Sequence, residues 1–142
     1  MEKTVNAFDK IVVRNEKHEA IVRNFAAQFA KMDASLLRPL FTDDVVYQDG
    51  PANPIIGLEP FLAEMDRWYR SVPRPPLTIG IQKIAVSLTT VITQREDERA
   101  THQSDVNVKI PVGGVFKIRG EKIFYWRDYF DRAEVFRLTQ AT

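Results

Sequence analysis

Hydrophobic positions along the chain follow a helical period in the first half and a strand period in the second. Near the N-terminus, apolar side chains recur at spacings of four, four and three residues, which indicates one face of a helix. These residues are Ile21, Phe25, Phe29 and Met32. Asp33 is the predicted N-cap of a second, short helix that reaches Phe41. A strand over residues 45–49 and a third helix over residues 58–69 complete the first half.

From residue 77 onward the hydrophobic period is two, which is typical of β-strands. The alternation slips by one residue at Gln82-Lys83, and such a slip indicates a β-bulge in a long, bent strand. Further strands are predicted over residues 90–99, 106–118 and 123–130, with Gly113-Gly114 expected to interrupt and kink the middle one. Helices followed by a run of antiparallel strands predict the α+β class, in one domain over residues 1–142.

Composition narrows the range of possible functions. The formal net charge is +1 with scattered basic residues, so no nucleic-acid partner is expected. The chain has no cysteine, which excludes disulfides, thiol catalysis and cysteine metal sites. No apolar run is long enough to cross a bilayer, and residues 1–14 lack the apolar stretch of a signal peptide. A cytoplasmic enzyme or binding protein is the expectation.

The last predicted strand places a carboxylate in an aromatic row. Four side chains share one face of this strand by alternation: Phe124, Trp126, Asp128 and Phe130. An ionised carboxylate is expensive in apolar surroundings unless it is paired, so Asp128 either meets a cation or takes up a proton. Both outcomes are common at active sites. The alternative is that Asp128 caps the strand end or pairs with a structural arginine.

The strand over residues 90–99 is unusually charged. Arg95, Asp97 and Arg99 share one of its faces by alternation, so Arg95 and Asp97 point the same way and can act together. Alternation alone does not show which face is inside. A solvated strand covered by ion pairs is therefore the alternative explanation.

Several motifs resemble the limonene-1,2-epoxide hydrolase family, within the SnoaL-like and ketosteroid-isomerase-like cone-shaped folds. They are Tyr47-Gln48-Asp49, Arg95-Glu96-Asp97, Gly114-Val115-Phe116 and Trp126-Arg127-Asp128-Tyr129-Phe130-Asp131. The resemblance covers residues 90–131 and the segment around Tyr47. It implies N-terminal helices packed on a strongly curved, mixed, mainly antiparallel sheet that forms a cone-shaped pocket, the cystatin-like α+β roll.

The resemblance also implies roles for individual residues. Asp128 falls where the family has the base that activates water, and Asp97 falls where it has the acid that protonates the epoxide oxygen. Arg95 matches the arginine between these carboxylates, and Tyr47 matches the tyrosine that helps to hold the water. The implied reaction joins a small epoxide and water into a vicinal diol, with no cofactor and no metal. A homodimer is also implied.

The sequence departs from the family at Asp49, where the family typically has an asparagine. Ionising three carboxylates around the single charge of Arg95 is electrostatically unfavourable in a pocket without water. Either Asp49 therefore holds a proton, or a second cation lies near the three carboxylates. Arg99 is the natural cation, because it shares a face with Arg95. The alternatives are a solvated strand end for Arg99 and a turn residue before Gly50-Pro51 for Asp49.

The substrate pocket is expected to contain Arg99 and five further side chains. These are Met65, Ile110, Val112, Trp126 and Phe130. The leading hypothesis for the whole chain is a cofactor-independent epoxide hydrolase. Two alternatives stay open: an isomerase or cyclase that uses Asp49 as general base, and a non-catalytic cone that binds a small ligand or mediates dimerisation.

Overall fold

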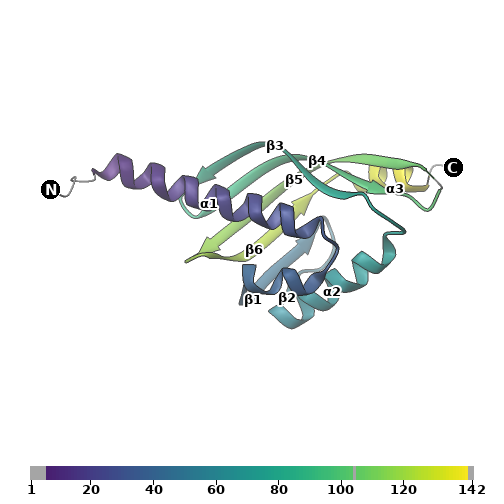
Figure 1. Cartoon of the computed structure of the whole chain (residues 1–142), viewed down its shortest axis with the longest axis horizontal. Helices are drawn as coiled ribbons and strands as arrows, with labels where there is room; N and C mark the ends of the chain where they lie inside the picture. Colours follow the sequence, from purple (N-terminus) through teal and green to yellow (C-terminus); the bar gives the residue numbers. More distant parts are fainter. Residues whose placement is uncertain (1–5, 104, 141–142) are drawn as a thin grey trace.

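The chain folds into helices packed on one curved sheet in a computed structural model that describes residues 6–103 and 105–140 (Figure 1). The helices are α1 (Ala7–Phe29), α2 (Leu58–Ser71) and α3 (Arg132–Gln140), with short 3-10 turns η1 (Ala34–Leu36) and η2 (Arg38–Leu40). The strands are β1 (Phe41–Asp49), β2 (Ile55–Ile56), β3 (Leu77–Ser87), β4 (Thr90–Ala100), β5 (Asn107–Arg119) and β6 (Lys122–Tyr129). No helix among the described residues combines the length and apolar character that a membrane span requires.

The six strands form one open sheet in the order β2-β1-β6-β5-β4-β3. Strand β1 pairs with β6 in parallel, and every other neighbouring pair is antiparallel. Helix α1 packs along β3, helix α2 packs on β1, and α3 lies beside the ends of β4 and β5 (Figure 1). The mixed, mainly antiparallel α+β arrangement predicted from the resemblance is confirmed.

Aromatic side chains fill the space between the helices and the concave face of the sheet. Trp126 of β6 is buried at the centre of this cluster. Its ring centroid lies 4.8 Å from that of Phe25 on α1 and 4.6 Å from that of Tyr47 on β1. Phe116 of β5 stacks on the indole at 5.9 Å and 11°. Because large aromatic rings bury much area in fixed geometries, this cluster holds β1, β5 and β6 in place beside the site.

The structure confirms the long bent strand and corrects several element boundaries. The register of β3 against β4 shifts between Ile81 and Lys83, which is the predicted bulge. Helix α1 ends at Phe29, whereas Met32 has a positive φ of 57° outside it. Asp33 does cap η1 through Ser35, but Phe41 starts β1 instead of ending a helix. Strand β2 and helix α3 have no counterpart in the sequence-based prediction.

Two expectations about the strands are wrong, one about the continuity of β5 and one about the face on which Phe124 lies. Strand β5 runs through Gly113 and Gly114 without a register shift against β4, so the glycines do not interrupt it. The pairing of β5 with β6 shifts between Lys117 and Ile118, and this irregularity moves Phe124 out of the row that contains Trp126. Phe124 lies under the guanidinium of Arg119, 4.5 Å from its ring centroid, on the outer side. A bulge breaks simple alternation because it adds one residue to one strand only.

Candidate active site

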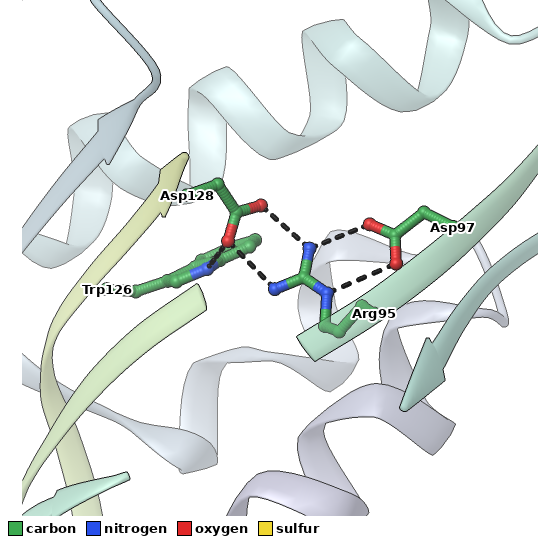
Figure 2. Close-up of polar contacts among 4 residues, drawn as sticks. All are labelled: Arg95, Asp97, Trp126 and Asp128. Atoms are coloured by element: carbon green, nitrogen blue, oxygen red, sulfur yellow. Dashed lines mark hydrogen bonds and ion pairs between the residues drawn. The ribbon is translucent and has the colours of Figure 1, made fainter. Parts of the chain in front are cut away.

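The buried Arg95 side chain lies between the carboxylates of Asp97 and Asp128 and binds both (Figure 2). Arg95 Nη1 and Nη2 donate to the two carboxylate oxygens of Asp128 at 2.8 and 2.9 Å. Arg95 Nε and Nη2 donate to the two oxygens of Asp97 at 3.1 and 2.7 Å. The Arg95 side chain is 1% exposed. Burial opposes its charge, but the Asp128 charge and these hydrogen bonds outweigh that effect and raise the pKa of Arg95. The guanidinium is therefore permanently charged.

The strand register explains how residues 33 positions apart meet. Thr93 of β4 pairs with Gly114 of β5, and Gly114 in turn pairs with Asp128 of β6. The Arg95 side chain reaches across β5 at this level. A Cβ on Gly114 would lie 2.5 Å from Arg95 Nη1 and 2.7 Å from Thr93 Oγ1, which is too close for a real side chain. Gly114 is therefore required for space.

Trp126 contributes to the polar site as well as to the core. Its indole Nε1 donates to Asp128 Oδ1 at 2.7 Å (Figure 2). Sequence reasoning placed Trp126 in the pocket wall and missed this contact, although a tryptophan two positions from an aspartate on the same strand face is the available signal. Asp128 thus accepts three hydrogen bonds, two from Arg95 and one from Trp126.

The Arg95 site lies in the wall of a cavity of about 340 Å³. The cavity is lined by all eleven residues that the sequence nominated: Tyr47, Asp49, Met65, Arg95, Asp97, Arg99, Ile110, Val112, Trp126, Asp128 and Phe130. Their placement together is a finding of the structure, while their chemical roles stay predictions. Helix α3 adds Arg132, Val135, Phe136 and Thr139, which sequence reasoning did not nominate because it predicted no helix there.

Asp49 and Tyr47 lie on β1, directly beside β6. In the parallel register Tyr47 pairs with Trp126 and Asp49 pairs with Asp128, so both side chains face the cavity next to the Arg95 site. Asp49 is therefore part of the cavity wall. Asp49 also opens the predicted turn, because its carbonyl oxygen accepts from Ala52 N at 3.1 Å, so its backbone forms the turn while its side chain lines the cavity.

Burial and charge shift the pKa values of these groups. Burial, reinforced by the charge of Asp128, raises the pKa of Asp49 to about 6. Burial also raises the pKa of Asp97, and the hydrogen bonds from Arg95 offset this only in part. Burial holds the pKa of the Tyr47 hydroxyl far above its ordinary value, so that group keeps its proton. Asp49 and Asp97 accordingly hold a proton more readily than an exposed aspartate does.

The arrangement can perform acid–base chemistry on a small molecule. Asp128 presents a carboxylate with three donors, and Asp97 presents a second carboxyl group whose surroundings favour a bound proton. Paired carboxyls in unlike environments can act as base and acid at the same pH. Within residues 6–103 and 105–140, no group of three or more histidine, aspartate or glutamate side chains is arranged to hold a metal ion.

Comparisons with known proteins agree with this fold. The family model for the limonene-1,2-epoxide hydrolase catalytic domain matches residues 16–141. A solved LEH-like epoxide hydrolase from M. tuberculosis is 24% identical, with a TM-score of 0.74 over 89% of this chain and 91% of that chain. A putative SnoaL-like polyketide cyclase from a Jannaschia species is 14% identical, with a TM-score of 0.77 over 99% of both chains. At these identities the solved structures show the shared fold alone.

Proposed function

Since the chain belongs to the limonene-1,2-epoxide hydrolase family, we propose that it adds water to a small epoxide to give a vicinal diol. The observation that carries this proposal is the Arg95 guanidinium held between Asp97 and Asp128 in the wall of a cavity. Epoxide opening needs a nucleophile at carbon and a proton at the departing oxygen. The two aspartates on either side of Arg95 are suited to supply both. The epoxide and water are the proposed partners, and a homodimer stays a prediction.

In the proposed step, Asp128 removes a proton from a water molecule as its oxygen attacks one epoxide carbon. The C–O bond at that carbon breaks, and Asp97 donates its proton to the departing oxygen. The two proton transfers avoid a free alkoxide. The proton then returns from Asp128 to Asp97 to restore the starting state.

Neighbouring groups support this division of roles. The Trp126 indole and the Arg95 guanidinium fix the Asp128 carboxylate through three hydrogen bonds, which orients its lone pairs toward the cavity. Tyr47 keeps its hydroxyl proton and lies beside Trp126 in the strand register, within the cavity wall. A neutral hydroxyl both donates and accepts hydrogen bonds, so Tyr47 is suited to hold the attacking water.

Product analysis on a diverse epoxide panel tests the proposal. Wild type should form diols, whereas Asp97→Asn and Asp128→Asn should each lose roughly 10³-fold or more in kcat, since each removes one proton-transfer partner. A single turnover in heavy-oxygen water should label the diol and leave the protein unlabelled. Near-normal turnover by either variant, or label in the protein, would contradict the mechanism.

A second function is favoured by the position of Asp49. This carboxyl group is half-buried beside Asp128, and its pKa of about 6 is close to that of an effective general base. An isomerase or cyclase with Asp49 as its base is therefore the alternative. Asp49→Asn discriminates between the two: it should leave diol formation within a few-fold of wild type but disable an Asp49-dependent isomerisation.

A further inference from the structure

Arg99 places a second positive charge in the wall of the cavity. It lies near the end of β4, four residues beyond Arg95 and on the same face. Its side chain is half-buried, and its guanidinium carbon lies 5.9 Å from the ring centroid of Trp68 on α2. Both residues line the cavity. The interpretation of Arg99 as a fully solvated strand end is therefore wrong.

This guanidinium lacks a close anionic partner in the described part of the chain. The ion pairs there include two for Arg95 but none within 4.0 Å for Arg99. Burial lowers the pKa of Arg99, and the charge of Asp49 opposes this only at longer range. A partly desolvated cation without a hydrogen-bonded anion is costly, and an incoming anion would remove much of that cost.

The position of Arg99 relative to the Arg95 site defines where such an anion would sit. Asp97 and Arg99 are two residues apart on one strand, so their Cα atoms are separated by about 7 Å. A molecule that accepts a proton from Asp97 can therefore reach Arg99 with a group only a few bonds away. Glu98 and Arg132 also line the cavity and contribute one formal charge of each sign.

We propose that Arg99 binds a carboxylate on the substrate, so that this protein acts on epoxides that carry an acidic group close to the ring. The inference rests on the proposed function and specifies its substrate class. A guanidinium fork matches a carboxylate in a bidentate geometry, and the Trp68 ring supports one face of that fork. The apolar part of the substrate would contact the hydrophobic wall formed by Ile110, Val112 and Phe136. The charge of Asp49 attracts Arg99 at longer range, but no ion pair joins these two residues. The Arg99 guanidinium therefore stays available to a substrate carboxylate.

A matched pair of substrates tests this inference. We would compare cis-γ,δ-epoxycyclohexanecarboxylate with its methyl ester, in wild type, Arg99→Met and Arg99→Lys. Wild type should prefer the acid. Arg99→Met should lower kcat/KM for the acid about 10- to 100-fold while changing that for the ester less than about threefold. Arg99→Lys should restore part of the loss. Ester turnover by the same variant shows that its site is folded, and Arg137→Met, an exposed arginine on α3 outside the cavity wall, is the matched control.

A binding measurement keeps the inference independent of catalysis. Both tryptophans of the chain, Trp68 and Trp126, line the cavity, so intrinsic fluorescence reports its occupation. Phenylbutanoate should bind wild type more tightly than phenylbutanamide does, and Arg99→Met should abolish that difference.

The outcomes separate the two proposals. Equal losses on acid and ester, or equal binding of the anion and the amide by wild type, would overturn the role of Arg99 and leave epoxide hydrolysis standing. If no epoxide of either kind yields a diol, the proposed function fails. The fluorescence titration then decides alone whether Arg99 forms a carboxylate site.

Discussion

Gly114 offers a sharp test of how the fold builds the Arg95 site. Its φ is not positive, so the backbone conformation at this position is compatible with alanine. The only obstacle to alanine is a steric clash of its methyl group with neighbouring atoms. The added methyl group would lie 2.5 Å from Arg95 Nη1, 2.7 Å from Thr93 Oγ1 and 3.0 Å from Phe116 Cε2. Ordinary contacts begin at 3.4 Å, so the guanidinium must withdraw by roughly 1 Å from the position in which Nη1 donates to Asp128 at 2.8 Å.

The expected magnitude follows from that one contact. A hydrogen bond between charged groups contributes about 1.5–3 kcal/mol. If Gly114→Ala loses it in the transition state, kcat/KM should fall about 10- to 150-fold, because each 1.36 kcal/mol corresponds to a tenfold change in rate. Crowding in a filled core should also lower the free energy of unfolding by about 1–3 kcal/mol.

Gly113→Ala is the matched control for this variant. It is the same substitution one position earlier on β5, and its methyl group would meet only the backbone oxygens of Thr93 and Tyr129, at 4.0 Å. It should keep full diol formation and unfold within about 1 kcal/mol of wild type. The assays are diol formation and urea unfolding on both variants. If Gly114→Ala matched Gly113→Ala in kcat/KM, the steric account of Gly114 would be refuted.

Two further predictions concern side chains that contact Asp128 or lie beside it. Trp126→Phe removes the Nε1 donor to Asp128 and should lower kcat about tenfold or more with little change in KM, a loss that Trp68→Phe should not reproduce in kcat. Burial and the Asp128 charge raise the pKa of Asp49 from 3.8 to about 6. The folded state therefore binds more protons than the unfolded state in that window, and stability falls as pH rises through it. Asp49→Asn should abolish this fall and, in chemical unfolding at pH 7, stabilise the protein by up to about 3 kcal/mol. An unchanged pH profile of stability in Asp49→Asn would contradict the burial of that carboxyl group.

Local periodicity predicted much of the fold. The bulge near Gln82, the helix of α2 and the strands β3 to β6 follow from spacing alone, because side-chain direction repeats with a fixed period in each element. The predictions fail for elements whose structure depends on contacts with other parts of the chain. Helix α3 is a short C-terminal element, and the Phe124 irregularity depends on pairing with β5, which one strand's sequence does not reveal.

The sequence by itself determined that Asp128 shares a strand face with Trp126, and that Arg95 and Asp97 point the same way. Only the tertiary structure decided that the two faces meet, because strand order and register set which distant residues are neighbours. It also showed why position 114 is a glycine, since a side chain there would occupy the space that the Arg95 guanidinium fills. The placement of Asp49 and Arg99 in the wall of one cavity was likewise decided there, since the exposure of a charged side chain depends on what other elements pack over it.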